Sequence, residues 1–191
     1  VPHALGQKVN FKKNFGPDLE KIDFKILNDV KKQDFLKKLN PVYETIKKTK
    51  TKLSSNNKDL IGFVGAPWTL LLYMLNRKSP KEGNFSLFTK DKYVQDILMK
   101  LDQFLKIHID AQIENGASII QIFDSWAGLL PEKDLEYFVY KPIKSLVDFI
   151  KQKKTISICF PRNIKNYKKF VDNVNPDIIS IDYNINPSII R

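Results

Sequence analysis

The sequence predicts an α/β fold with a parallel sheet, and more specifically a partial (β/α)8 TIM barrel with about four of the eight βα units present. Four short runs rich in Ile and Val alternate with segments whose apolar residues recur at helical spacing. The chain also begins without Met and ends in NINPSIIR, where the next helix of a barrel is expected. The four predicted strands are residues 60–64, 118–123, 155–160 and 178–182.

Each of these runs is almost continuously apolar, as in LIGFV and TISICF, which is typical of strands covered on both faces. Four βα units in series fit either a doubly wound sheet or a piece of a barrel. A closed barrel needs eight strands, and half a barrel leaves two apolar edges unpaired. We therefore expect residues 1–191 to be a single partial domain, the middle section of a barrel with both ends missing.

The segments between the strands predict helices. Apolar residues at helical spacing run from 91 to 115, where Asn115-Gly116 ends the helix because Gly tolerates the left-handed position that follows. Pro131 is expected to open the next helix, and Pro142 to kink or split it near Tyr140.

A shorter helix is predicted at 164–174, and another at 41–54 with Val42, Ile46 and Leu53 on one side. Residues 7–27 contain Gly16-Pro17 and alternating apolar residues, so they predict an extended excursion rather than a barrel unit.

Composition narrows the class of partner and compartment. The net charge is +11, yet of 32 basic residues only Arg77, Arg162 and Arg191 are arginines. Bidentate phosphate recognition favours Arg, so a dedicated nucleic-acid reader is disfavoured, whereas a cationic surface suits a polyanionic small molecule. Cys159 is the only cysteine, and no apolar run is long enough to cross a membrane. These features indicate a cytoplasmic protein with neither a nucleic-acid nor a membrane partner.

Distinctive residues follow the predicted strands at the end where parallel α/β folds bind ligands. Residues 65–69 (GAPWT) follow the first strand, with Tyr73 one helical turn further on. Residues 124–128 (DSWAG) follow the second, Pro161-Arg162 the third and Asp182-Tyr183 the fourth. Small, aromatic and polar residues that converge on one rim predict a pocket for a large flat ligand.

At these residues the chain resembles the uroporphyrinogen decarboxylase family. The resemblance is carried, in order along the chain, by LGQKVNFKKNFGP (5–17), GFVGAPWTLLLYML (62–75), GASIIQIFDSWAG (116–128), ISICFPR (156–162) and IISIDY (178–183). It implies a lyase of haem biosynthesis that converts uroporphyrinogen III to coproporphyrinogen III by removing four acetate carboxyl groups. It also implies that no cofactor or metal takes part, and that the enzyme is a homodimer. The 191-residue chain alone is expected to be inactive.

Individual roles follow from the resemblance only where the motifs match. Tyr73 and Ser125 match the family's hydroxyl groups near the reacting acetate, and Phe63 and Phe123 match aromatic pocket positions. Tyr73 and Ser125 are thus the candidate catalytic residues, and all four residues are candidate substrate-binding residues. The family's aspartate that bonds the pyrrole N–H groups has no counterpart here, so Asp124 and Asp182 remain open between that role and a structural one.

Two other functions compete with this interpretation. Zinc-dependent corrinoid or thiol methyltransferases share the barrel and use a His-x-Cys pair, but here Ser157 stands at the His position before Cys159. A non-catalytic pseudoenzyme is the other alternative, because a fold does not fix a function. His108 lies on the apolar stripe of its predicted helix, which favours a satisfied buried histidine over a catalytic one.

Overall fold

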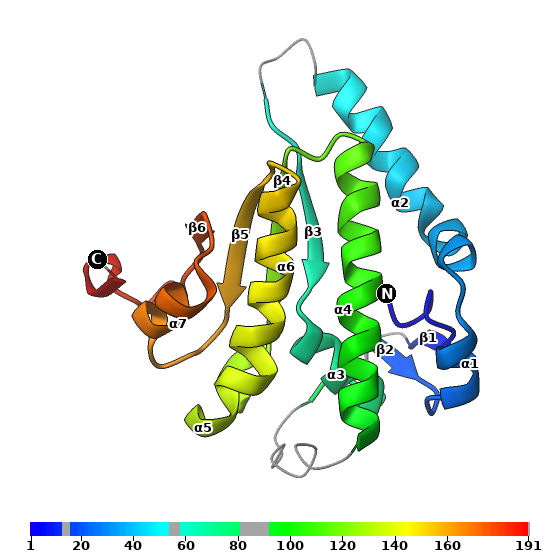
Figure 1. Cartoon of the computed structure of the whole chain (residues 1–191), viewed down its shortest axis with the longest axis horizontal. Helices are drawn as coiled ribbons and strands as arrows, with labels where there is room; N and C mark the ends of the chain where they lie inside the picture. The colour runs from blue at the N-terminus through cyan, green and yellow to red at the C-terminus, as the bar shows by residue number, and fades with distance from the viewer. Residues whose placement is uncertain (13–15, 54–57, 81–91, 191) are drawn as a thin grey trace.

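The structure is a computed structural model that describes residues 1–12, 16–53, 58–80 and 92–190. Its centre is a four-stranded parallel sheet with the strands in sequence order (Figure 1). The strands are β3 (Ile61–Gly65), β4 (Ile119–Asp124), β5 (Ile156–Pro161) and β6 (Ile178–Ile179). The predicted order and parallel direction are confirmed, and three strands begin one residue later than predicted. The fourth strand was predicted too long, because only two of its residues join the ladder.

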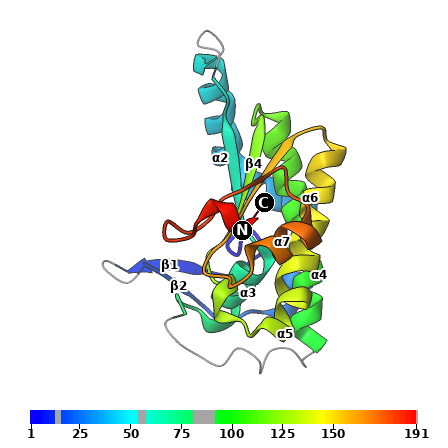
Figure 2. The same cartoon turned by 90° about the vertical axis from the view of Figure 1, so that its left-hand side faces the viewer.

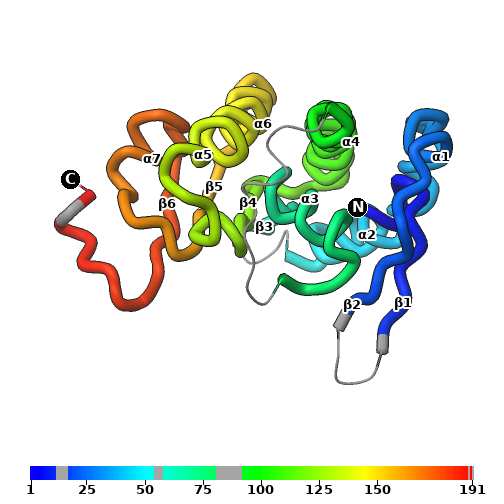
Figure 3. The backbone as a smooth tube through the Cα atoms, turned by 90° about the horizontal axis from the view of Figure 1, so that it is seen from below, coloured from blue at the N-terminus to red at the C-terminus, as the bar shows by residue number. Residues whose placement is uncertain are grey.

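Helices cover one side of this sheet, as the view from below shows (Figure 3). The covering helices are α4 (Lys92–Glu114), α6 (Lys141–Gln152) and α7 (Tyr167–Val174), and α3 (Pro67–Asn76) begins below the end of β3. Val64, Ile120, Ile122 and Cys159 point from the strands into this layer and are at most 2% exposed. The main core therefore lies between the sheet and these helices.

The opposite face of the sheet is not covered, contrary to the prediction from the apolar runs. Residues there alternate with the buried ones, and Ile61, Phe63 and Ile156 are 47%, 65% and 44% exposed. The strands are nevertheless almost continuously apolar in sequence, because this face carries Ile and Phe instead of the polar residues of a solvated sheet. Nothing in the described part of the chain packs over them to the extent that the helices cover the other face.

Two helix boundaries agree with the sequence prediction. Gly116 follows α4 with φ of 113°, in the left-handed region that was predicted for it. The helix after Pro131 is split as expected: α5 (Glu132–Leu135) leads into a π-helical turn, Glu136–Tyr140, before α6. Pro142 lacks the N–H that would continue the α-helical pattern, and a π-helical turn is one of the ways in which a helix absorbs such a defect.

The helix predicted at 41–54 is wrong in its start, and its predicted apolar side is right for Ile46 but not for Val42. α2 spans Lys32–Leu53 and runs through Pro41, which lies on its exposed side. Tyr43 and Ile46 are buried, whereas Val42 is 41% exposed.

The N-terminal part forms the predicted excursion. β1 (Val9–Lys12) and β2 (Gly16–Leu19) pair antiparallel and project beside α3 (Figure 2), and α1 (Phe24–Asp29) follows. Arg77 fixes this hairpin to the end of α3, because its Nε and backbone carbonyl both bond the backbone of Leu19. Within the described residues no helix has the length and apolar character needed to span a membrane.

The side chain of Gln112 forms hydrogen bonds with the outer edge of the sheet, at β3. Leu60 and Ala66 direct their backbone groups toward β4, so by strand alternation Phe63 directs its own toward the outer edge of β3. Gln112 of α4 accepts from the Phe63 N–H (3.0 Å) and donates to the Phe63 carbonyl (3.2 Å). A Cβ at Gly62 would lie 2.6 Å from Oε1 of Gln112, which explains the glycine in this strand.

Candidate active site

The carboxyl end of the sheet holds the residues that the sequence singled out. After β3, Ala66 is extended and Pro67 opens α3, where its missing N–H leaves no helical bond unmade. Tyr73 lies two turns into this helix and is partly exposed. Its ring meets the ring of Trp126 edge to face, with centroids 6.4 Å apart. Tyr73 of α3 and the loop after β4 are therefore neighbours, as predicted.

The loop that carries Ser125 is fixed to the loop after β5. Arg162 N–H donates to the Asp124 carbonyl and Gly128 N–H donates to the Arg162 carbonyl, both at 3.0 Å. At Gly128 a Cβ would lie 2.4 Å from the backbone oxygen of Asn163, so the two loops approach closely only because this residue is glycine. The sequence Asp-Ser-Trp-Ala-Gly thus holds Ser125 beside Arg162.

Ser125 and Arg162 line the same hollow, which has a volume of about 420 Å³. Its wall is made by residues from the ends of β4, β5 and β6, namely Ser125, Phe160, Arg162, Asn163, Ile181, Asp182, Tyr183 and Asn184. The Arg162 side chain is exposed and makes no ion pair within the described residues. An unpaired guanidinium beside a serine hydroxyl suits a ligand that carries carboxylates.

Asp182 has a structural role in this hollow. One of its oxygens accepts from the Asn163 N–H (2.6 Å) and from the Tyr167 hydroxyl (2.5 Å). The burial of Tyr167 and its bond to this carboxylate raise the pKa of the phenol above its ordinary value. Asp182 therefore secures the loop after β5 to α7 while it also lines the hollow.

A row of three phenylalanines crosses the uncovered face of the sheet. Phe123 pairs in register with Phe160, and Phe63 lies on the same face of β3, two residues before the partner of Phe123. The rings meet edge to face, with centroids 6.0 Å apart for Phe63 and Phe123 and 6.4 Å apart for Phe123 and Phe160. The sequence had singled out Phe63 and Phe123 and missed Phe160, although the register of parallel strands would have placed it beside Phe123.

Tyr73 lines a second, more apolar hollow of about 490 Å³, between α3, the hairpin and the N-terminal segment. Its wall consists of Val1, Pro2, His3, Val9, Phe11, Pro17, Leu19, Leu70 and Tyr73. The structure thus places Tyr73 and Ser125 at one end of the sheet but in separate hollows, with the Trp126 ring against Tyr73.

Asp124 ends β4 and points into the helix layer, away from the uncovered face. It is fully buried, and its Oδ1 accepts from the Thr69 hydroxyl at 2.7 Å. Burial raises the pKa of this carboxyl group to about 7, against the lowering effect of the bond from Thr69. Asp124 therefore does not face the hollow beside Ser125, and its position contradicts a direct contact with ligand.

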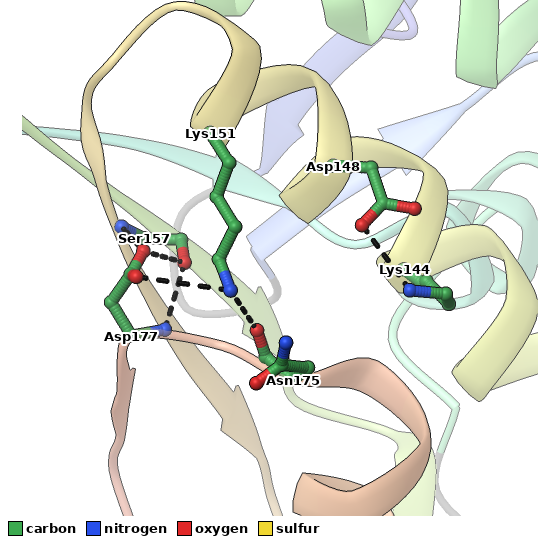
Figure 4. Close-up of polar contacts among 6 residues, drawn as sticks. All are labelled: Lys144, Asp148, Lys151, Ser157, Asn175 and Asp177. Carbon is green, nitrogen blue, oxygen red and sulfur yellow. Dashed lines mark hydrogen bonds and ion pairs between the residues drawn. The ribbon is translucent and has the colours of Figure 1, made fainter.

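The residues of β5 that face the helices also test the alternative of a zinc-dependent methyltransferase. Cys159 is completely buried there, and burial raises the pKa of its thiol far above the ordinary value. Figure 4 shows that Ser157 bonds Asp177 at the opposite, amino end of the sheet, where Lys151 also reaches Asp177. Among the described residues no three His, Cys, Asp or Glu side chains gather as a metal site would require. The described residues therefore do not supply the three protein ligands of a catalytic zinc site.

His108 is a packing residue, as the sequence suggested, and the structure shows that Trp68 is another. His108 is 6% exposed, and its Nδ1 lies 3.0 Å from the Tyr43 hydroxyl. Burial lowers the pKa of this imidazole to about 4, so it is neutral in the folded protein near pH 7. Trp68 is fully buried, with its ring against Phe138 at 5.1 Å between centroids.

The fold is that of a parallel α/β protein, and its candidate ligand site lies at the carboxyl ends of the strands. The family model described as "Uroporphyrinogen decarboxylase (URO-D)" matches residues 1–191. The chain therefore belongs to the uroporphyrinogen decarboxylase family.

Curated relatives agree with this assignment. The uroporphyrinogen decarboxylase of Rickettsia bellii is 39% identical over 95% of this chain and 55% of the relative. That of Orientia tsutsugamushi is 38% identical over 97% of this chain and 55% of the relative. The chain thus spans about half the length of the curated relatives that it matches.

A solved structure shows the same fold at low sequence similarity. A methyltransferase from Methanosarcina mazei superposes with a TM-score of 0.64 over 94% of this chain and 60% of that chain. Its sequence is 15% identical, so the likeness concerns the fold alone.

Proposed function

We propose that this protein is a uroporphyrinogen decarboxylase, which converts uroporphyrinogen III to coproporphyrinogen III by removing four acetate carboxyl groups. The observation that carries the proposal is the family match over residues 1–191. The matching hydroxyl residues lie at the carboxyl end of the sheet, and the matching phenyl residues lie on its uncovered face. The proposal includes a homodimer that needs no cofactor, as the family resemblance implies. It also includes a cytoplasmic location, which the single cysteine indicates.

The same proposal extends to the fold. Residues 1–191 would form one partial domain that contributes about four βα units to a (β/α)8 barrel. The uncovered sheet face supports this, because Ile61, Phe63 and Ile156 would become interior residues once the barrel closes. The similarity of the chain to about half of its relatives' length is in keeping with this picture.

This reaction requires the protein to position the substrate and to supply positive charge, and it requires no bound cofactor. A protonated pyrrole ring accepts the electron pair that carbon dioxide leaves behind, and a proton then replaces the carboxyl group. The phenylalanine row offers an apolar surface for the macrocycle, and Arg162 offers positive charge to its carboxylates. The hydroxyls of Tyr73 and Ser125 offer donors for charge that changes during the reaction.

The direct test is an anaerobic assay of the full-length protein with uroporphyrinogen III, followed by chromatography of the oxidised products. We expect coproporphyrinogen and partly decarboxylated intermediates, with no loss of rate after treatment with a metal chelator. Stoichiometric zinc in elemental analysis, removed together with all activity by the chelator, would instead support the methyltransferase alternative. A folded protein that binds but does not decarboxylate the macrocycle would support the pseudoenzyme.

Arg162 gives a second prediction. Arg162→Gln is expected to raise KM for uroporphyrinogen roughly 10- to 100-fold, the range for one lost hydrogen bond to a charged group, with a smaller change in kcat. Lys165→Gln is the matched control, since Lys165 is exposed three residues away and does not line the Ser125 hollow. Steady-state kinetics of both variants measure KM and kcat. Equal KM values for Arg162→Gln and Lys165→Gln would show that Arg162 does not bind the substrate.

A further inference from the structure

Ser125 lies between two residues that are both bonded to the first turn of α3. On one side, the Thr69 hydroxyl donates to Oδ1 of Asp124 at 2.7 Å. On the other, the Trp126 backbone N–H donates to the same hydroxyl at 3.3 Å, and the Trp126 carbonyl accepts from Nε1 of Trp68 at 3.0 Å. We call Trp68, Thr69, Asp124 and Trp126 the α3 clamp.

The clamp also reaches Tyr73. Thr69 and Tyr73 are four residues apart on α3 and so lie one turn apart on the same face. The helix contains no Gly, and its Pro lies at its first position, so the geometry between these two residues is that of a regular helix. The Trp126 ring, held by its backbone to Thr69 and Trp68, packs edge to face against the Tyr73 ring.

The chemistry of the clamp depends on a hydroxyl. The Thr69 side chain is 6% exposed, and its one oxygen donates to a carboxylate and accepts from a backbone amide at the same time. Neither a methyl group nor a thioether does both. Asp124 is fully buried, and its carboxyl group interacts with the Thr69 hydroxyl and also with the Trp126 backbone N–H. Removal of the hydroxyl therefore takes one hydrogen bond from each of the two chain neighbours of Ser125.

We propose that Thr69 is a positioning residue, which through the α3 clamp fixes the Ser125 and Tyr73 hydroxyls relative to each other at the site of decarboxylation. The inference rests on the proposed function, and it assigns a role to a residue that touches neither hollow. Thr69 acts through Asp124 and Trp126 and does not itself contact the substrate.

The experiment compares Thr69→Val, Thr69→Ser and Thr45→Val in the full-length protein. Thr69→Val keeps the shape and removes the hydroxyl, and we expect kcat to fall roughly 10- to 100-fold with KM within about twofold, as for a misplaced catalytic group. Thr69→Ser restores the hydroxyl and should recover most of kcat. Thr45→Val makes the same chemical change on the exposed side of α2 and should leave both constants unchanged. Thr69→Ala gives the same test where Thr69→Val does not fold.

A double variant separates positioning from general damage to the fold. In a Ser125→Ala background, Thr69→Val should lower kcat much less than it does in the wild type, because part of what it positions is already absent. Equal losses in both backgrounds, or wild-type kcat in Thr69→Val, would overturn the positioning role while leaving the proposed function intact. A wild-type protein that forms no coproporphyrinogen would overturn the proposed function itself.

Discussion

Tyr73→Phe and Ser125→Ala should each slow the formation of coproporphyrinogen by roughly 10- to 1,000-fold, while the protein remains folded. Each change removes one hydroxyl group from the rim and leaves the surrounding rings and loops in place. A donor aimed at charge that develops in a transition state contributes about 1–4 kcal/mol, which sets this range. Steady-state assays with uroporphyrinogen III measure the rates, and thermal melts confirm that both variants fold.

Matched controls exist on the exposed surface. Tyr137→Phe removes a phenolic hydroxyl from a residue that is 42% exposed, and Ser188→Ala removes an exposed serine hydroxyl. Neither control should change the rate by more than about twofold, in line with ordinary surface substitutions. Wild-type rates in both rim variants would refute the assignment of the two hydroxyls, even if the protein proves to be a decarboxylase.

The second large effect is on the pH dependence of stability, because the buried groups Asp124 and His108 change it in opposite directions. Burial raises the pKa of Asp124 from 3.8 to about 7, so its contribution to stability is present at low pH and is lost as pH rises through about 7. Burial lowers the pKa of His108 from 6.5 to about 4, so its contribution is present above pH 6.5 and is lost as pH falls toward 4. These pKa changes correspond to roughly 4 and 3 kcal/mol, respectively.

Single variants should therefore reveal opposite slopes. Asp124→Asn removes the first group, and the free energy of unfolding should then rise between pH 4 and 6.5. His108→Gln removes the second, and the free energy should then fall between pH 4 and 7. Urea unfolding at intervals across this range measures both profiles. Asp172→Asn, on the exposed side of α7, is the control and should follow the wild type. Profiles parallel to the wild type in both buried-site variants would show that neither group titrates as described.

Much of the scaffold was predictable because local sequence carries its signals. The Ile- and Val-rich runs gave the strand order, Gly116 gave the end of α4, and Pro142 marked the irregular helix beside Tyr140. The rim was predictable for the same reason, since the residues after each strand are distinctive. Parallel strands then bring those residues to one edge without further information.

Tertiary partners were not predictable from the same patterns. Periodicity reports that a residue such as Thr69 or Gln112 is buried, but it does not report which carboxylate or backbone group the residue meets. Asp124 illustrates the limit: its place after a strand suggested the ligand side, whereas strand alternation directs it into the helix layer. Pro41 illustrates another, because tertiary packing holds α2 helical on both sides of a residue that usually marks a boundary.

The Gln112 amide occupies the outer edge of β3 much as one residue of a neighbouring strand would. An extended chain that approaches this edge finds the Phe63 N–H and carbonyl already bonded and must interrupt its ladder there. An incoming strand is thereby restricted in the alignments that it can adopt, whether it belongs to the same polypeptide or to another molecule. The interruption disfavours continuous strand addition between molecules, the route by which exposed sheet edges aggregate. Gln112 thus protects the outer edge of an apolar sheet against pairing with a strand of another molecule.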